Sequence, residues 1–165
     1  MRTKTAILAS LAVSAAVAGP AVAASTRIVP GRSIGPVAIG QERATIELHH
    51  GPGTVLSSVP NPDLPPNPNW VIQVVRFASV GIDARFPTAE ASIQTDRLTT
   101  TRATYRTVRG IGVGSTRAAV RARYPAAACS ATICRLGVKA PGKVITRFHI
   151  RTGRVWKVEL LQLPS

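Results

Sequence analysis

Residues 143–160, KVITRFHIRTGRVWKVEL, decide the fold because apolar and charged side chains alternate on both sides of Thr152-Gly153. A period of two is typical of a β-strand with one buried and one solvated face. A short turn that contains glycine joins two such strands into a hairpin. The dry face of the predicted hairpin carries Val144, Thr146, Phe148, Ile150, Trp156, Val158 and Leu160. The solvated, basic face carries Lys143, Arg147, His149, Arg151 and Lys157.

The same period of two occurs in residues 80–86, VGIDARF, which predict a further strand. Residues 59–69 are predicted to form an exposed loop, because the five prolines in this segment have no backbone N–H to donate. Residues 99–101 are all threonine, which fits a connector between two halves of the chain and equally fits a strand.

The chain also contains an internal repeat. Residues 37–46, VAIGQERATI, align with residues 111–120, IGVGSTRAAV, and in each copy a glycine step leads into a short predicted helix. Gly51-Pro52 ends the first helix and Pro125 ends the second. Strands follow each helix. The sequence therefore predicts an α+β fold of two tandem helix-then-antiparallel-sheet repeats, residues 24–98 and 99–165, with the helices packed on one face of the sheet.

This arrangement resembles β-lactamase inhibitor protein and, more distantly, the small outer-membrane lipoproteins of the β-barrel assembly machinery. The matching residues are the two Gly-x-x-x-Ala-x-apolar segments, 40–46 and 114–120, and the cysteine pair of the second copy. The first copy differs, because it has no cysteines and carries the proline-rich loop instead. The resemblance implies that each unit packs its helices on one side of a short antiparallel sheet. It also implies that the open side of the sheet binds a protein partner.

The first residues have the features of a secretory signal peptide. Arg2 and Lys4 precede an apolar run, residues 6–18, that is too short to span a membrane as a helix. Small residues at Ala21 and Ala23 then form a cleavage site, so cleavage is expected after Ala23. We therefore expect a secreted protein, found outside the cell or in the cell envelope, without a transmembrane anchor.

Cys129 and Cys134 are the two cysteines of the chain, and an exported protein is expected to join them in a disulfide. Two free thiols are the alternative. A loop this short stabilises the fold by about 2 kcal/mol at most, because closing it removes little entropy from the unfolded chain.

Positive charge is concentrated in the second half of the chain. Of the 21 basic side chains, Arg2 and Lys4 fall in the leader, which leaves 19 against 7 acidic ones, a net charge of +12. Residues 24–96 hold five basic and six acidic groups, whereas residues 97–157 hold fourteen basic groups and no acidic one. Such a charge attracts acidic proteins and polyanions, although an arginine-rich composition alone is the simpler explanation.

The basic hairpin face, together with Arg117 and Arg121 on the second helix, is the candidate binding site. We expect a secreted, non-enzymatic binding protein that holds an acidic extracellular protein, for example an enzyme that it inhibits. The alternative is a protein that binds an anionic envelope component, either wall polymer or anionic lipid. Nucleic acid is a less favoured partner, because few aromatic side chains lie among the basic ones.

Catalytic motifs are weak, and no cofactor or metal is expected. Residues 31–35 spell G-x-S-x-G, but they lie too close to the mature N-terminus to follow the strands of a hydrolase sheet. The glycines of residues 110–115 lack a Walker lysine. His49 and His50 are adjacent, so they point about 100° apart on a helix instead of sharing one face as metal ligands do. A hydrolase with an unrecognised site remains a third hypothesis.

Overall fold

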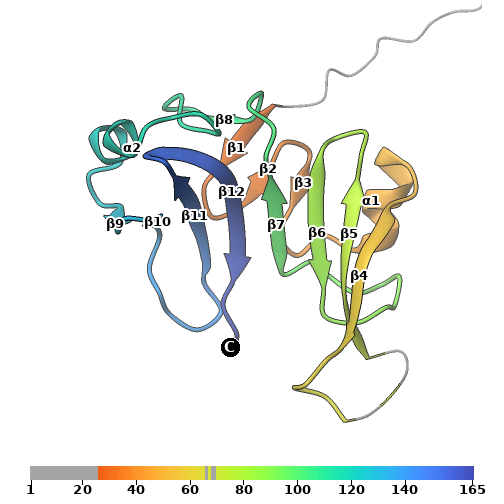
Figure 1. Ribbon diagram of the computed structural model, residues 1–165. Helices are drawn as coiled ribbons and strands as arrows, with labels where there is room; N and C mark the ends of the chain where they lie inside the picture. Colours follow the sequence, from red (N-terminus) through yellow and green to blue (C-terminus); the bar gives the residue numbers. More distant parts are fainter. Residues whose placement is uncertain (1–25, 66, 68–69) are drawn as a thin grey trace, which may run out of the picture.

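The computed structural model describes residues 26–65, 67 and 70–165 (Figure 1). The expected signal peptide and the cleavage site at Ala23 lie outside these residues. There are two described helices, α1 (Arg43–His50) and α2 (Arg117–Arg123). The described strands are β1 (Arg27–Val29), β2 (Ser33–Ile34), β3 (Val37–Ala38), β4 (Thr54–Pro60), β5 (Val71–Phe77), β6 (Ile82–Phe86), β7 (Arg97–Thr100), β8 (Arg106–Thr107), β9 (Ala128–Cys129), β10 (Ile133–Leu136), β11 (Val144–Arg151) and β12 (Arg154–Gln162).

The main element is one antiparallel sheet of eight strands in the order β4-β5-β6-β7-β12-β11-β10-β9. The fold is mostly β, with 43% strand and 11% helix, so the prediction of two α+β helix-then-sheet repeats was wrong. The physical reason lies in β7, whose Leu98 pairs with Ala84 of β6 on one side and with Leu160 of β12 on the other. The threonines at 99 and 100 thus belong to a strand that joins the two halves of the chain into a single sheet.

The shortness of the two helices is the second reason why the fold differs from the predicted one. α1 begins at Arg43 and α2 at Arg117, each three residues after a glycine with positive φ, Gly40 or Gly114, so the repeat is present locally. Yet each helix buries a single fully enclosed residue, Ile46 in α1 and Val120 in α2. Helices of eight and seven residues cannot cover one face of an eight-stranded sheet.

The predicted hairpin is confirmed as β11 and β12, and it is the most extensive strand pair of the sheet. Thr152 and Gly153 both have positive φ, as a type I′ turn requires. The alternation predicted for residues 80–86 is confirmed as well, since Ile82, Ala84 and Phe86 are buried. The predicted loop 59–69 starts two residues later than expected, because Val59 and Pro60 form the end of β4.

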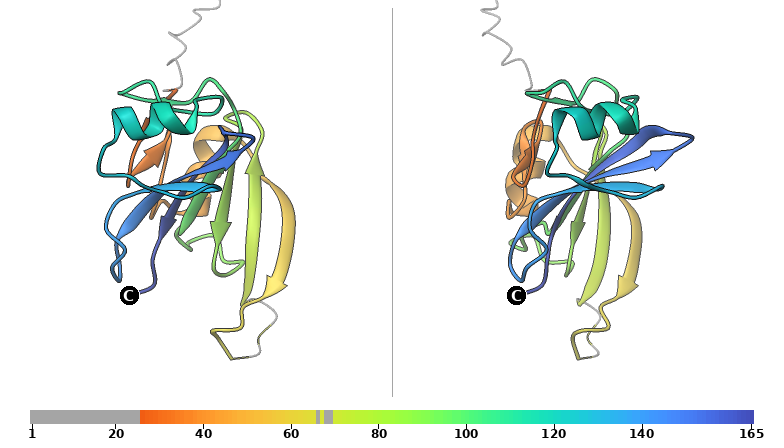
Figure 2. Two further views of the ribbon diagram at one scale, coloured as in Figure 1. Left: turned by 60° about the vertical axis from the view of Figure 1, so that its left-hand side comes forward. Right: turned by 90° about the vertical axis from the view of Figure 1, so that its left-hand side faces the viewer.

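One face of the large sheet packs against a smaller sheet in the order β3-β2-β1-β8, with α1 beside it (Figure 2). Ile28 and Ile34 from the small sheet and Phe148 and Leu160 from the large sheet belong to one hydrophobic core. The backbone N–H of Gly31 donates to Oγ1 of the buried Thr146 at 2.8 Å, which ties the small sheet to β11. The opposite face of the large sheet is left for other interactions.

A disulfide between Cys129 and Cys134 is present, as predicted. The two cysteines lie directly opposite each other on β9 and β10, so the bond fixes the short edge strand to the sheet. Among the described residues, no helix has both the length and the hydropathy that are needed to span a membrane.

Candidate functional site

The face of the large sheet that carries Arg97, Arg147, His149 and Glu159, which we call the open face, is the candidate site. Directly paired residues on neighbouring antiparallel strands point to the same side. The register therefore places one row of side chains across all eight strands of this face. In strand order from β4 to β9, the row is Thr54, Arg76, Asp83, Thr99, Glu159, Arg147, Arg135 and Ala128.

A second row runs beside the first and contains a further pair of arginines. Arg97 of β7 pairs with Arg85 of β6 on one side and with Leu161 of β12 on the other. Val74 and Ser57 continue this row to β5 and β4. The open face therefore carries a basic centre and becomes apolar toward the β4 edge, where the face of β4 and β5 presents Val59, Ile72 and Val74.

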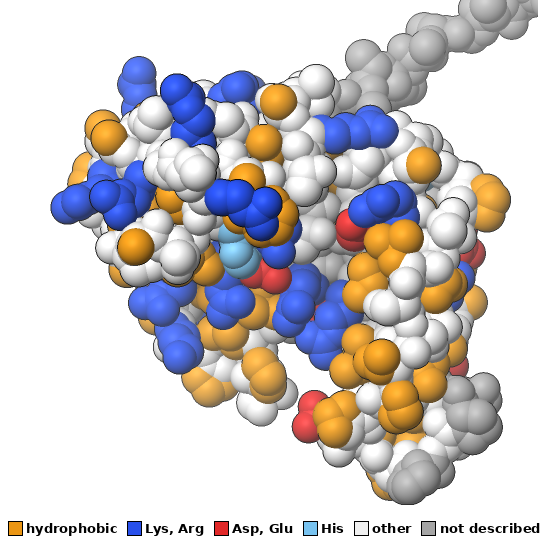
Figure 3. All heavy atoms as spheres, in the orientation of Figure 1, with side chains coloured by type: hydrophobic (Ala, Val, Ile, Leu, Met, Phe, Trp, Pro, Cys, Tyr) orange, Lys and Arg blue, Asp and Glu red, His pale blue; other side chains and the backbone are white. Residues whose placement is uncertain are grey.

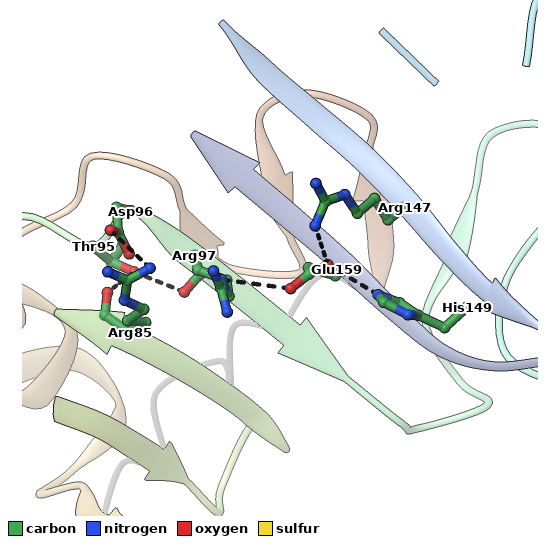
Figure 4. Close-up of polar contacts among 7 residues, drawn as sticks. All are labelled: Arg85, Thr95, Asp96, Arg97, Arg147, His149 and Glu159. Atoms are coloured by element: carbon green, nitrogen blue, oxygen red, sulfur yellow. Dashed lines mark hydrogen bonds and ion pairs between the residues drawn. The ribbon is translucent and has the colours of Figure 1, made fainter. Parts of the chain in front are cut away.

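Glu159 is the anionic centre of the open face, and only 4% of its surface is exposed. Nε2 of His149 donates to Oε2 of Glu159 at 2.9 Å, and Nη1 of Arg147 lies 3.4 Å from the same oxygen (Figure 4). Nε of Arg97 lies 3.5 Å from Oε1. Burial by itself raises the pKa of Glu159, but the His149 hydrogen bond and the charges of Arg97, His149 and Arg147 outweigh it and lower the pKa.

A second carboxylate, Asp96, lies at the start of β7 on the other side of Arg97. Its Oδ2 is 3.6 Å from Nη1 of Arg85. Burial raises the pKa of Asp96, against the opposing effect of the charges on Arg85 and Arg97. Oγ1 of Thr95 lies 3.0 Å from the backbone carbonyl oxygens of both Arg85 and Arg97, so its hydroxyl links β6 and β7 beside this carboxylate (Figure 4). The cluster thus alternates positive and negative groups across four strands, β6, β7, β12 and β11.

The hydrogen-bonding capacity of the arginines is not used up within the described residues. The Nε atoms of Arg85, Arg97 and Arg135 are buried and have no hydrogen-bond partner there, and Oδ1 of Asp96 is in the same state. Arg135 of β10 lies directly opposite Arg147 of β11, and like charges in this position are destabilising. Within the described residues, the fold therefore leaves part of the donor capacity of these arginines without a hydrogen bond.

Trp156 belongs to the open face, and the prediction that it lies on the dry face was wrong. The register of the hairpin shifts between His149 and Ile150, which makes Trp156 an extra residue on β12. Its ring meets the His149 ring edge-on at 6.2 Å between centroids. The cationic groups of Arg151 and Lys157 lie 4.4 and 4.9 Å from the ring centroid. The bulge therefore adds an aromatic ring to the basic surface.

The structure brings some of the predicted site residues together and separates others. Arg147, His149 and Lys157 are half-buried on the open face, and Arg151 is exposed at the turn end of β11. Lys143 lies before β11 and is exposed, outside the ladder. Arg117 and Arg121 lie on α2, which packs near β10 (Figure 1). Both residues are exposed. They lie outside the two rows on the sheet, and the start of α2 contacts the hairpin turn, where the backbone N–H of Arg117 donates to the carbonyl oxygen of Gly153 at 2.9 Å.

Sequence reasoning missed four arginines of the open face, Arg76, Arg85, Arg97 and Arg135. The signal for Arg85 was present, because the alternation in residues 80–86 places it on the solvated side of its strand. No local pattern shows that β7, with β6 on its other side, lies beside β12, since the β7–β12 pairing joins segments that are about 60 residues apart. The candidate surface therefore extends into the first half of the chain, whose net charge is close to zero.

The surface is hollowed at two places along the rows of the open face (Figure 3). The upper hollow has a volume of about 540 Å³, and its lining includes Arg76, Asp83, Thr99, Arg102, Trp156 and Lys157. The lower hollow has a volume of about 520 Å³, and its lining includes Asn61, Arg85, Asp96, Arg97, Leu161 and Ser165. Both have the size of small-ligand sites, and both are wide open to solvent.

The other motifs have structural explanations. Ser33 of the G-x-S-x-G segment lies in β2, between two strands, where no helix follows to form a nucleophile elbow. His49 and His50 end α1, where Nδ1 of His49 lies 2.8 Å from the carbonyl oxygen of Thr45. Burial and the neighbouring His49 lower the pKa of His50.

Comparison with protein-family models, with curated protein sequences and with solved structures finds no match to this chain. The resemblance to the β-lactamase inhibitor proteins therefore stays a prediction from the sequence, and the function has to be argued from the open face itself.

Proposed function

We propose that this chain is an exported, non-enzymatic binding protein that holds an acidic protein partner on its open face. An acidic enzyme that it inhibits is one partner of this kind. The apolar leader and the Cys129–Cys134 disulfide support export, because disulfides persist in oxidising compartments.

The surplus of cations on the open face is the observation that carries this proposal. Within the described residues, Arg135, Arg151 and Lys157 have no carboxylate partner, and a single buried carboxylate, Glu159, is shared by three cationic side chains. A self-contained structural cluster would pair these charges internally. Here, the cationic side chains without a carboxylate partner point to a ligand that supplies carboxylates.

The chemistry of arginine favours carboxylates at this site. A guanidinium presents a planar fork of donors that matches the two oxygens of a carboxylate. The side chains of Arg147 and Arg97 are 29% and 36% exposed, so their environment is drier than bulk water while a ligand can still reach them. Charge-assisted hydrogen bonds are stronger in such an environment.

A protein partner is favoured over a simple polyanion because the cations are held at fixed spacings on a sheet. Arg135, Arg147 and Glu159 occupy successive strands of one row, which are about 5 Å apart. Binding there depends on the shape of the ligand as well as on its charge. The exposed arginines of α2, Arg117, Arg121 and Arg123, favour the second candidate, an anionic envelope polymer or lipid surface that responds to net charge alone.

Two double variants with the same change in charge separate these functions. Arg147→Gln with Arg151→Gln alters the open face, and Arg117→Gln with Arg121→Gln alters α2. Binding of polyglutamate is measured over a salt series that includes physiological ionic strength, and circular dichroism checks that each variant is folded. We expect the first variant to bind about tenfold more weakly and the second to bind as the wild type does. If both variants bind polyglutamate equally more weakly than the wild type at low salt, and this difference disappears at high salt, the polyanion function is favoured instead.

A further inference from the structure

The two hollows of the open face lie in line along the same pair of strands. Asp83 of β6 and Thr99 of β7 line the upper hollow, while Arg85 and Arg97, two residues away on each strand, line the lower one. Residues two apart on a strand share a face. The two hollows thus lie end to end on one face, parallel to β6 and β7, and we call them together the trough.

The length of this trough suits an extended chain. On β12, Lys157 lines the upper hollow and Leu161 lines the lower hollow. Four residues of a strand span about 13 Å, at about 3.3 Å each. A segment of four or five extended residues therefore fills the trough from end to end.

The two sides of the trough differ in chemistry. On the β12 side, Lys157 has no anionic partner among the described residues, and Arg97 and Arg147 share Glu159. On the β5 side, Arg76 lines the upper hollow and is paired with Asp83. Next to the trough on the same face, Ile72 and Val74 are partly exposed and Val59 of β4 is 50% exposed. Figure 3 shows basic side chains gathered on the β11–β12 side and hydrophobic side chains gathered over β4 and β5.

We infer that the trough binds an extended polypeptide segment of the acidic partner, with its carboxylates toward β12 and its apolar side chains toward β5 and β4. This inference rests on the proposed function and deepens it, because it states which kind of segment the open face accepts. Alternate side chains of an extended segment point to opposite sides, so a sequence that alternates acidic and apolar residues matches both walls.

Filling the trough without changing its charge tests this inference. Thr99 is a half-buried floor residue between Asp83 and Glu159 in the cross-strand row, and Thr99→Trp places a large ring there. Thr101 is exposed and lines the upper hollow, so Thr101→Trp narrows the trough without disturbing the sheet. The matched control is Thr132→Trp, at an exposed position in the β9–β10 turn.

Two probes are titrated against each folded protein at physiological ionic strength, polyglutamate and a glutamate–leucine copolymer of equal charge. For the wild type and for Thr132→Trp we expect the copolymer to bind about tenfold more tightly, because its leucines bury apolar surface on the β5 side. Thr99→Trp and Thr101→Trp should abolish this difference. If both trough variants bind both probes as the wild type does, while Arg147→Gln still weakens binding, the trough does not bind an extended segment. The proposed function then stands without it. If the wild type binds neither probe, both proposals fail.

Discussion

Arg135 of β10 and Arg147 of β11 lie directly opposite each other on the open face, with Glu159 of β12 as the next residue in the same row. Nε of Arg135 is buried without a hydrogen-bond partner among the described residues. Like charges directly opposite in a ladder destabilise a sheet, whereas a β-branched residue is well suited to a strand.

Arg135→Thr is therefore expected to separate stability from binding. We expect the free energy of unfolding to rise by about 0.2–1 kcal/mol, since the substitution removes the like-charge pair. Urea unfolding measures this change. Binding of polyglutamate should become weaker in the same variant. A variant that is both less stable and unchanged in binding would show that Arg135 has a structural role only.

Glu159→Gln is expected to have the opposite pair of effects. The carboxylate is 5% exposed and neutralises Arg97, Arg147 and His149, so its loss should cost about 1–3 kcal/mol of stability at neutral pH. The arginines reach solvent in part, which limits this cost. Polyglutamate should bind more tightly, because its carboxylates no longer compete with Glu159. Weaker binding by a folded Glu159→Gln protein would contradict the role given to the cations.

The pH dependence of stability follows from the lowered pKa of Glu159. A carboxylate whose pKa is lower in the folded than in the unfolded state stabilises the fold above its unfolded pKa. This contribution is lost as the pH falls through the folded pKa, below the ordinary value of 4.5. The raised pKa of Asp96 changes stability with pH in the opposite direction. Asp96 is present in the wild type and in Glu159→Gln, so a comparison of these two proteins isolates the contribution of Glu159.

Urea unfolding of the wild type and of Glu159→Gln as a function of pH checks this assignment. The difference in stability between them should be constant near neutral pH and should shrink as the pH falls below 4.5. A difference that grows on acidification would mean that Glu159 is protonated in the folded protein.

Trp156 lines the upper hollow, and we expect it to report ligand binding there. Its ring lies against His149, Arg151 and Lys157. Trp70 lies between the proline-rich loop and β5. In a Trp70→Phe background, addition of polyglutamate should change the emission of Trp156, because the cations over its ring reorient toward the ligand. An unchanged spectrum on saturation would place the bound chain away from this part of the open face.

Local sequence patterns predicted the hairpin, both helix starts and the disulfide. Each of these features depends on a short stretch of residues, such as the alternation in residues 143–160 or the glycines at 40 and 114. The global arrangement could not be predicted in this way. Whether the threonines at 99–101 connect two halves of the chain or belong to a strand depends on the pairing of β7 with β6 and β12, which a local period cannot show.

The same distinction applies to the site. Arg147 and His149 were found from their strand, but Arg85 and Arg97 join them through the pairing of distant strands. Trp156 was assigned to the wrong side because a β-bulge inserts one residue and reverses the alternation at that point. A regular period of two cannot show a bulge.

Residue-resolved NMR of the isotope-labelled protein, titrated with polyglutamate at physiological ionic strength, tests the central claim most directly. The account predicts that chemical shifts change at Arg97, Arg147, His149 and their neighbours on β7, β11 and β12, with little change on α2. Changes concentrated at Arg117, Arg121 and Arg123, or spread evenly over the basic surface, would contradict it and would identify a protein that responds to charge alone.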